Sequence, residues 1–220
     1  MNMDRAIVAD MRISYDKDIL LEDNAPSSPF PLFEQWFASA KDSMPAEAEV
    51  NAVALATASK TTGRPSCRMV LLKGFDERGF VFYTNYESRK ATDLDGNPFA
   101  AMTFWWGQRS VRVEGKVVKL AAEESDAYYA SRPLGSRIGA WSSPQSKVLP
   151  DGRKMLDSLN QTMNDRFKTN EPSRPSFWGG YRIVPDSIEF WQGRPSRLHD
   201  RLQYNLDELS NKWSLVRLAP

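Results

Sequence analysis

The stretch VRVEGKVVKL, residues 111–120, is the clearest guide to the fold of this sequence. Its valines at 111, 113 and 117 alternate with charged residues at 112, 114 and 116. Successive side chains of a β-strand point to opposite faces, so this pattern predicts a strand with one face toward a core and one toward water.

Further short apolar stretches lie on both sides of this strand. We expect strands at residues 53–57, 67–72, 80–84, 100–106, 181–184, 188–191 and 213–218. Residues 74–79 are predicted to form a hairpin loop, and Pro185-Asp186 a turn. Apolar residues at helical spacing predict helices at residues 33–40, 123–132 and 151–167, the first of them closed by Pro45. This mixture predicts a mainly β fold, an antiparallel barrel or sandwich with peripheral helices.

The composition limits both domain count and function class. The 220 residues suit one generous domain, and we expect residues 29–220 to form it, preceded by a flexible polar arm at residues 1–28. With 29 basic and 28 acidic residues, no net field draws the chain to nucleic acid or to a membrane. A single cysteine and a single histidine exclude an intrachain disulfide and every multi-histidine zinc site. No apolar run of about 18 residues and no signal peptide is present, which predicts a cytoplasmic protein.

Phosphate-binding chemistry is visible only in side chains. The sequence has neither a G-x-G dinucleotide fingerprint nor a G-x-x-x-x-G-K phosphate loop. Arg68 and Lys73 bracket an apolar strand, and Thr84, Arg89 and Lys90 follow it; guanidinium and ammonium groups both suit phosphate oxygens. Spacing alone favours ordinary charged strand ends, because strict alternation puts Arg68 and Lys73 on opposite faces.

A second group combines a phenol, a guanidinium and a hydroxyl. Tyr128 and Arg132 are four residues apart on a predicted helix, so they share a face, and Ser136 follows Pro133-Leu134-Gly135. The three could converge on a second phosphate. From spacing alone, a solvated helix end with a turn after it is the favoured interpretation.

The densest cluster of polar side chains runs from Trp191 to Arg201. If the chain is extended from Arg197 onward, Arg197, His199 and Arg201 project to one side and repel one another unless an anion binds there. The alternative is a surface cluster neutralised by Asp200 and other acids. The arginines on either side of His199 favour a binding site slightly over a structural role for this histidine.

Ten motifs in order along the chain resemble those of the pyridoxamine/pyridoxine 5′-phosphate oxidase family. They are RMVLLK (68–73), SRK (88–90), VRVEG (111–115), SRP (131–133), IGAW (138–141), QS (145–146), FWGG (177–180), EFWQG (189–193), RLHDR (197–201) and VRLAP (216–220). The likeness extends from about Arg12 to Pro220, and RLHDR together with the RLAP terminus is highly specific. Fungal members are expected to be the nearest relatives.

The resemblance implies an FMN-binding split β-barrel and a homodimer with FMN at the subunit interface. The implied FMN contacts are Arg68, Met69, Val70, Leu71, Leu72, Lys73, Tyr83, Thr84, Arg89, Lys90, Gln145, Ser146, Trp191 and Arg201. The implied substrate-binding residues are Lys73, Tyr128, Arg132 and Ser136 at the phosphate, Arg197 and His199 at the pyridine ring, and Arg12 and Tyr15 from the arm.

The implied reaction oxidises pyridoxamine or pyridoxine 5′-phosphate to pyridoxal 5′-phosphate. Dioxygen is reduced to H₂O₂, the flavin carries the electrons, and Arg197 and His199 are the expected catalytic residues.

One departure from the family pattern concerns FMN. Family members have Arg-Gln before Val-Arg-Val-Glu-Gly, and the Gln contacts FMN; here the pair is Arg109-Ser110, and the loop at residues 107–109 is about two residues short. Gln108 is the candidate substitute. The departure keeps a non-catalytic flavin or B6-phosphate carrier open as an alternative, beside a flavin reductase on the same barrel and a β-barrel domain without ligand.

Overall fold

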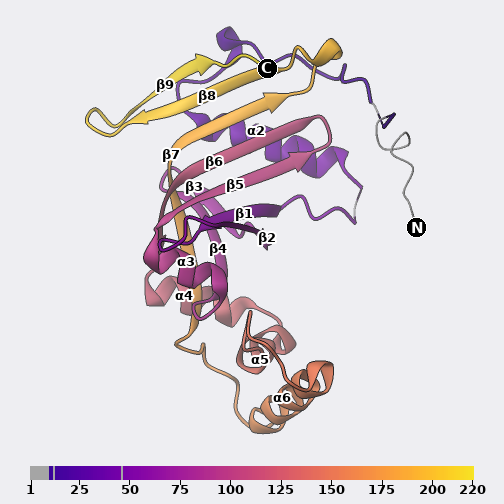
Figure 1. The fold of residues 1–220 in the computed structure, drawn as a ribbon, viewed down its shortest axis with the longest axis vertical. Coiled ribbons are helices and arrows are strands. Elements are labelled where there is room, and N and C mark those ends of the chain that lie inside the picture. The colour runs from indigo at the N-terminus through magenta and orange to yellow at the C-terminus, as the bar shows by residue number, and fades with distance from the viewer. Residues whose placement is uncertain (1–9, 12, 46) are drawn as a thin grey trace. The chain divides into compact units, whose positions relative to one another are not determined.

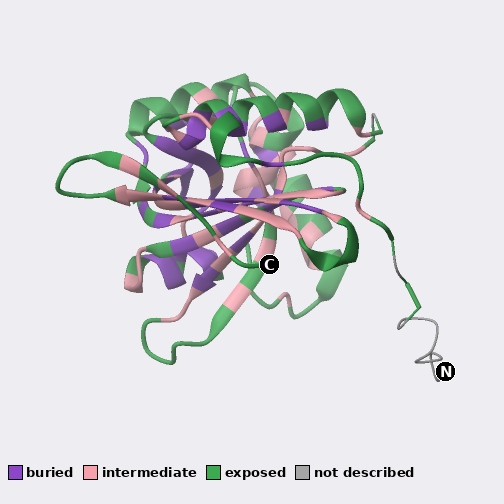
Figure 2. Cartoon of the chain, turned by 90° about the horizontal axis from the view of Figure 1, so that it is seen from above, coloured by how far each residue is buried: buried purple, intermediate pink, exposed green. Residues whose placement is uncertain are grey.

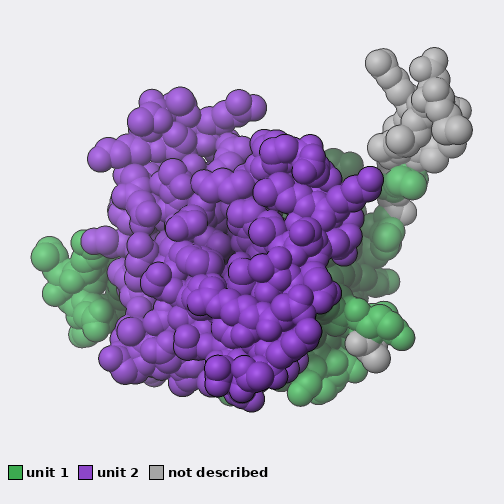
Figure 3. Space-filling model, turned by 90° about the horizontal axis from the view of Figure 1, so that it is seen from below, with its two compact units in different colours: residues 1–50, 103–112, 187–220 green, residues 51–102, 113–186 purple. Residues whose placement is uncertain are grey.

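The computed structural model describes residues 10–11, 13–45 and 47–220. The chain divides into two compact units (Figure 3). Unit 1 comprises residues 1–50, 103–112 and 187–220, and unit 2 comprises residues 51–102 and 113–186. The expected organisation, an arm at 1–28 and a single domain at 29–220, stays a prediction.

Unit 2 contains most of a nine-stranded sheet, whose strands are labelled in Figure 1. The strands run in the order β2-β1-β5-β6-β7-β4-β3, and β1/β2, β3/β4 and β4/β7 pair antiparallel. Their bounds are β1 Ala52–Ala58, β2 Pro65–Leu71, β3 Gly74–Asp76, β4 Gly79–Asn85, β5 Phe99–Trp106, β6 Arg109–Lys119 and β7 Trp178–Gln192. The helices of this unit are α3 Arg89–Gly96, α4 Ala122–Ser131, α5 Leu134–Ser142 and α6 Gly152–Arg166.

Unit 1 contains the remaining ends of β5, β6 and β7, together with the two C-terminal strands. β8 Asp200–Asp207 pairs with β7 and β9 Lys212–Arg217 pairs with β8, both antiparallel. One α-helix, α2 Pro29–Ser43, and two short 3₁₀ helices, η1 Glu22–Asn24 and η2 Pro195–Arg197, complete the unit as described. The fold is mainly β and antiparallel with helices, as the sequence predicts.

Apolar alternation positions the strands as predicted. Val111, Val113 and Val117 of β6 are buried, whereas the charged residues between them are not. The predicted stripe of α2 is buried through Phe33, Trp36 and Ala40, and the ring of Phe33 packs edge-on against Phe104 at 5.2 Å between centroids. Buried residues are concentrated along the strands (Figure 2).

The predicted turn at Pro185-Asp186 is wrong, because β7 runs through it without interruption. β4 pairs with residues 178–183 of β7, and β8 pairs with residues 187–192. Pro185 has no N–H to donate, and it lies between these two ladders, where a proline is tolerated in a strand. The predicted hairpin loop at 74–79 is also shorter than expected, because Gly74–Asp76 pair with β4 as β3.

Two helices do not appear in the sequence prediction. α3 begins directly after Ser88, and α5 begins after Pro133, so Ser136 lies on the first turn of a helix and not in a turn. Both are short, with 8 and 9 residues, and short helices give weak periodicity.

Candidate active site

A buried lysine is the centre of the first predicted cluster in unit 2. Lys90, on the first turn of α3, is 7% exposed. Its Nζ donates to the Oγ1 of Thr84 at 2.9 Å, the Oγ of Ser88 at 3.1 Å and the Oε1 of Gln145 at 2.7 Å. We name Arg68, Thr84, Ser88, Lys90 and Gln145 the cation cradle.

The positive charge of Lys90 has no acidic partner. Among the described residues, no carboxylate lies within ion-pair distance of its Nζ, and its contacts there are neutral oxygens. Burial, followed by the nearby charge of Arg68, lowers the pKa of Lys90 to about 8. A buried, unpaired ammonium group favours a bound anion.

Arg68 is held by three oxygens of the same unit. Its guanidinium donates to the backbone oxygen of Leu55 at 3.1 Å, the Oγ1 of Thr57 at 2.8 Å and the Oγ of Ser66 at 2.8 Å. Asp93 lies 3.9 Å away, and burial lowers the pKa of Arg68. These contacts fix the guanidinium in one orientation.

The other predicted FMN residues of unit 2 differ in exposure. Arg89, Lys73, Met69 and Ser146 are exposed, Val70, Leu71 and Tyr83 are half-buried, and Leu72 is buried. Lys73 follows the end of β2, and among the described residues its side chain makes no hydrogen bond or ion pair with a member of the cradle. Ser146 has a left-handed backbone, with φ 69°.

The second predicted group forms part of an aromatic stack. The rings of Tyr83 and Tyr128 are parallel with centroids 3.9 Å apart, and Trp178 stacks on Tyr83 at 5.5 Å. The guanidinium of Arg132 lies over the Trp178 ring at 4.6 Å.

Arg132 is a second cation without an acidic partner among the described residues. Its Nη1 is buried and has no hydrogen-bond partner, and burial lowers the pKa of the guanidinium. Ser136 is exposed on α5 and makes no side-chain hydrogen bond with Tyr128 or Arg132 within the described part of the chain.

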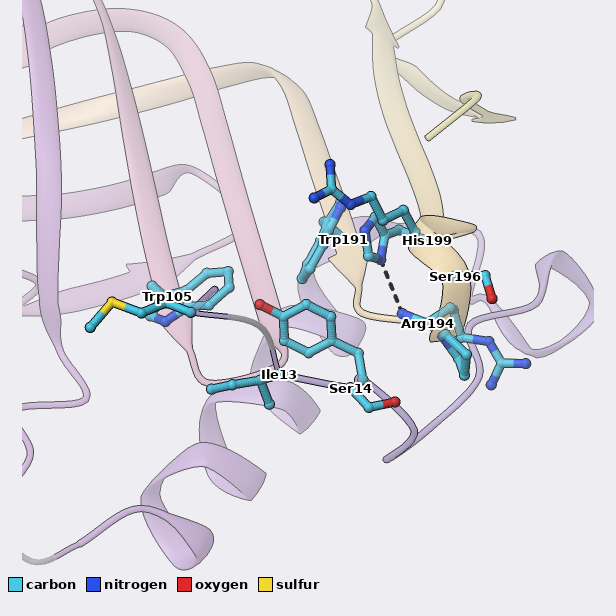
Figure 4. A pocket seen from close by; sticks show the side chains of 11 residues that line it. Ile13, Ser14, Trp105, Trp191, Arg194, Ser196 and His199 are labelled. Atoms are coloured by element: carbon cyan, nitrogen blue, oxygen red, sulfur yellow. Dashed lines mark hydrogen bonds between the residues drawn. The ribbon is translucent and has the colours of Figure 1, made fainter. Parts of the chain in front are cut away.

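In unit 1, aromatic and cationic side chains surround a cavity of about 490 Å³ (Figure 4). Its walls are Met11, Ile13, Ser14, Tyr15, Trp105, Trp191, Arg194, Pro195, Ser196, Arg197 and His199. Trp191 and His199 are 4.6 Å apart between ring centroids, and Tyr15 packs edge-on against both at 5.8 Å. Arg12, also predicted at this site, lies outside the described residues.

One hydrogen bond determines the tautomer of His199. The backbone N–H of Arg194 donates to His199 Nδ1 at 3.1 Å, drawn as the dashed line in Figure 4. With Nδ1 as an acceptor, neutral His199 carries its proton on Nε2. In this arrangement His199 presents a hydrogen-bond donor, not a free base, at Nε2.

The extended conformation considered for residues 197–201 does not form. Ser196 and Arg197 have positive φ values, 57° and 63°, within η2, and β8 begins only at Asp200. Arg201 does not join Arg197 and His199 as an unpaired cation. It donates from Nε to Glu189 Oε1 at 2.7 Å, and this bond raises the pKa of Arg201.

A second hollow, of about 410 Å³, lies beside Glu189. It is lined by Thr103, Trp105, Ser110, Arg112, Glu189, Trp191, Arg201 and Pro220. The buried Glu189 carboxylate accepts from Arg112 at 2.7 Å as well as from Arg201. Two predicted FMN residues, Trp191 and Arg201, therefore share this hollow with Ser110.

Gln108 does not stand in for the missing glutamine within this hollow. Its Oε1 accepts from the backbone N–H of Lys17 at 3.2 Å, and its side chain lines a different, small cavity.

Sequence reasoning missed the importance of Trp105, Trp178, Arg194 and Glu189. Trp105 is 55% exposed on β5, and a tryptophan on the water face of a predicted strand is the signal that could have identified it. Glu189 pairs with Arg112, far away in the sequence, and Arg194 contacts Asp18, also far away, so spacing carries no sign of these contacts.

The described residues contain neither a metal-binding cluster nor a helix that could cross a membrane. No group of three or more His, Cys, Asp or Glu side chains is arranged to hold a metal ion. None of the helices has the length and apolar character needed to span a bilayer.

Two family models match the chain, one after the other along the sequence. The family model described as pyridoxamine 5′-phosphate oxidase matches residues 41–158, and the model of the pyridoxine 5′-phosphate oxidase C-terminal dimerisation region matches residues 178–220. The chain belongs to the pyridoxamine 5′-phosphate oxidase family. The second match supports a homodimer, as expected.

Individual relatives agree with this assignment. The pyridoxine/pyridoxamine 5′-phosphate oxidase of Pseudomonas fluorescens Pf0-1 is 55% identical over 97% of this chain and 98% of its own length. That of Pseudomonas paraeruginosa PA7 is also 55% identical, with the same coverage. These oxidases are bacterial, and the expected kinship with fungal members stays a prediction.

Solved structures support the fold. PhzG from Burkholderia lata, in complex with tetrahydrophenazine-1-carboxylic acid, has a TM-score of 0.83 and 31% identity, covering 92% of this chain and 98% of its own. A pyridoxamine 5′-phosphate oxidase-related, FMN-binding protein from Nostoc punctiforme has a TM-score of 0.66 and 17% identity, covering 86% and 97%. The second likeness concerns the fold alone, and it agrees with the predicted split barrel.

Proposed function

We propose that this protein is an FMN-dependent oxidase that converts pyridoxamine or pyridoxine 5′-phosphate to pyridoxal 5′-phosphate, with O₂ reduced to H₂O₂. The observation that carries the proposal is that unit 2 contains two buried or half-buried cations, Lys90 and Arg132, without acidic partners among the described residues. One phosphate on a cofactor and one on a substrate would satisfy both.

The cation cradle fits the FMN phosphate. Lys90 and Arg68 supply charge, and the hydroxyls of Thr84 and Ser88 can turn toward phosphate oxygens. Gln145 of the cradle would also contact FMN, and the further FMN contacts are residues 69–73, Tyr83, Arg89, Ser146, Trp191 and Arg201, in a homodimer with FMN at the interface. Ser110 is too short to replace the glutamine of the family, so we expect weaker FMN binding than in members that retain it.

The second phosphate site consists of Lys73, Tyr128, Arg132 and Ser136. Arg132 is already oriented by Trp178, so little side-chain freedom is lost when an anion binds. Anchoring the phosphate uses binding energy remote from the reacting carbon to orient the substrate.

When bound, FMN would supply the two-electron oxidation and the transfer of electrons to O₂. The protein residues orient the substrate and exclude water. Arg197 would cover the substrate ring, and Tyr15 would close the site from the arm. The same role for Arg12 rests on the sequence motif alone. His199 would donate a hydrogen bond from Nε2, since its Nδ1 already accepts from Arg194.

A different substrate class is a second candidate because of the cavity in unit 1. Tyr15, Trp105 and Trp191 offer aromatic surfaces, and Arg194 and Arg197 offer positive charge, which together suit a planar carboxylated ring. PhzG, with its bound tetrahydrophenazine-1-carboxylic acid, is a relative with such a ligand.

The deciding experiment is anaerobic absorption spectroscopy of the FMN-loaded protein. Addition of pyridoxamine 5′-phosphate should bleach the flavin band, and admission of air should restore it with formation of H₂O₂. Separate additions of NADH and of a dihydrophenazine carboxylate test the flavin reductase and the second candidate. A yellow protein that binds pyridoxal 5′-phosphate yet bleaches with none of these would instead be a carrier.

A further inference from the structure

The first residue of η1 and the residues before it are held by an arginine near the C-terminus, within unit 1. Arg217 of β9 donates to both carboxylate oxygens of Glu22, at 2.6 and 2.7 Å, and to the backbone oxygen of Leu20 at 2.9 Å. Its remaining terminal nitrogen donates to Asp200 Oδ1 at 2.8 Å. Glu22 and Asp200 are therefore joined through one guanidinium.

Asp200 extends the same connection along the segment. Its Oδ2 accepts from the backbone N–H of Leu20 at 3.1 Å and lies 3.6 Å from Arg194 Nε. Arg194 in turn donates to the backbone oxygen of Asp18 at 3.1 Å, and the Asp18 carboxylate pairs with Arg109. We name Arg217, Asp200, Arg194 and Arg109 the arm clamp.

The clamped segment, residues 18–22, directly follows the residues that line the cavity of unit 1. Tyr15 lies three residues before Asp18 and forms part of the cavity wall with Met11, Ile13 and Ser14. The Tyr15 ring lies so close to Gly193 that a Cβ at that position would be 2.7 Å from Tyr15 Cγ. The Tyr15 ring therefore packs directly on the backbone of Gly193, which only a residue without a side chain permits.

The same clamp residues also contact the loop that carries His199. Arg194 holds the arm through its side chain and His199 through its backbone N–H. Asp200 follows His199 directly and holds both Leu20 and Arg217. Arm and histidine are therefore positioned by common partners, which an ordinary surface ion pair would not achieve.

We propose that Arg217 and Asp200 are positioning residues that clamp the N-terminal arm, so that Tyr15 forms a wall of the substrate cavity beside His199. The ligand class, a phosphorylated pyridine, rests on the function proposed above. The clamp itself does not depend on that function. Neither residue lines this cavity, so both act through Leu20, Glu22 and Arg194.

The direct test is hydrogen exchange of the full-length, FMN-loaded protein, followed by mass spectrometry. The variants are Arg217→Ala, Asp200→Asn and the milder Glu22→Gln, which keeps the side-chain shape. Peptides covering residues 17–22 should exchange about tenfold faster in Arg217→Ala and roughly threefold faster in Glu22→Gln. Arg217→Lys should recover part of the protection.

The matched control is Arg78→Ala, which removes an exposed ion pair with Asp76 in unit 2. It should leave exchange at residues 17–22 unchanged. Steady-state kinetics with pyridoxine 5′-phosphate should show a KM raised about five- to tenfold in Arg217→Ala, with kcat within about twofold and FMN content unchanged.

Three outcomes separate the clamp from the proposed function. If no variant accelerates exchange at residues 17–22, or if Arg78→Ala does so equally, the clamp is overturned whatever the activity. If exchange accelerates but kcat falls with KM constant, the residues do not position a wall of the binding cavity. If exchange accelerates and the wild type oxidises no B6 phosphate, the clamp holds and only the proposed substrate fails.

Discussion

Two cations of unit 2, Lys90 and Arg132, and two of unit 1, Arg201 and Arg217, have opposite surroundings. In unit 2, Lys90 and Arg132 lack acidic partners among the described residues, and burial lowers the pKa of each. In unit 1, Arg201 is paired with Glu189 and Arg217 with Glu22 and Asp200, and these partners raise the pKa of both arginines. Unpaired cations suit the binding of an anion, whereas paired cations hold protein segments together.

The largest effect is expected where a cation is most buried. Lys90→Met should weaken FMN binding about 100-fold, because a charge-assisted hydrogen bond contributes about 1.5–3 kcal/mol. Fluorescence titration of the apoprotein with FMN measures this loss. Lys90→Arg, which keeps the charge, should bind FMN within about tenfold of wild type; equal losses in both variants would show that shape, not charge, matters.

Removal of the second unpaired cation should affect substrate and not cofactor. Arg132→Ala should raise KM for pyridoxine 5′-phosphate roughly 30-fold while the FMN content stays constant. Arg153→Ala on α6, whose partner Asp157 is exposed, is the control and should change neither. A loss of FMN from Arg132→Ala would contradict the assignment of two separate phosphate sites.

Breaking a pair in unit 1 should instead lower stability. Glu189→Gln leaves Arg201 without its charged partner, so the free energy of unfolding should fall by about 1–3 kcal/mol. Urea denaturation provides the measurement. If FMN binding were lost with no change in unfolding midpoint, Arg201 would belong with the unpaired cations of unit 2.

The pH dependence of FMN binding tests whether the unpaired charge of Lys90 binds the cofactor. Lys90 has a pKa of about 8 in the folded protein, below its usual value of 10.5, so its charge is present below pH 8 and is lost above it. FMN affinity should therefore be flat below pH 8 and fall by up to about tenfold per pH unit above it. In the unfolded chain Lys90 stays protonated up to its usual pKa of 10.5, so the unfolded state binds more protons than the folded state above pH 8. The free energy of unfolding of the apoprotein should therefore rise as the pH increases above 8.

Lys90→Arg should abolish this pH dependence, because the guanidinium stays charged throughout. The measurement is a set of FMN titrations across pH 6.5–9.5 on both proteins. A wild-type affinity that is constant across the range would remove Lys90 from the phosphate site.

The smallest effect concerns the departure from the family motif. Ser110→Gln should tighten FMN binding about three- to tenfold, since one neutral hydrogen bond is worth about 0.5–1.5 kcal/mol. Isothermal titration with FMN detects a change of this size. Unchanged or weaker binding would mean that the hollow beside Glu189 is not adapted to the longer side chain.

The spacing of apolar residues predicted the strands of the sheet and helix α2 well. β6 and α2 each bury a regular set of apolar residues, and such regularity is visible in sequence. The course of β7 through Pro185 was not predictable, because it depends on which strands pair on either side of that residue. The short helices α3 and α5 gave too little periodicity to be recognised.

The candidate site was predicted less evenly. Lys90 and Arg132 were named from motifs, and both are buried or half-buried cations without acidic partners among the described residues, while their binding roles stay predictions. Arg201 was grouped with Arg197 and His199 on the assumption of an extended chain, and the left-handed residues Ser196 and Arg197 prevent that grouping. Ion pairs between distant segments, such as Arg217 with Glu22, leave no local trace in sequence.

Gly193, which lies against the Tyr15 ring, allows the position of Tyr15 to be tested separately from the ion pairs that hold the arm. Any side chain at Gly193 would meet Tyr15 at 2.7 Å, while every ionic contact of residues 17–22 would be left intact. The substitution Gly193→Ala should therefore displace the Tyr15 ring without removing any ion pair that holds the arm. The ionic attachment of residues 17–22 and the packing of Tyr15 in the cavity wall can therefore be altered separately.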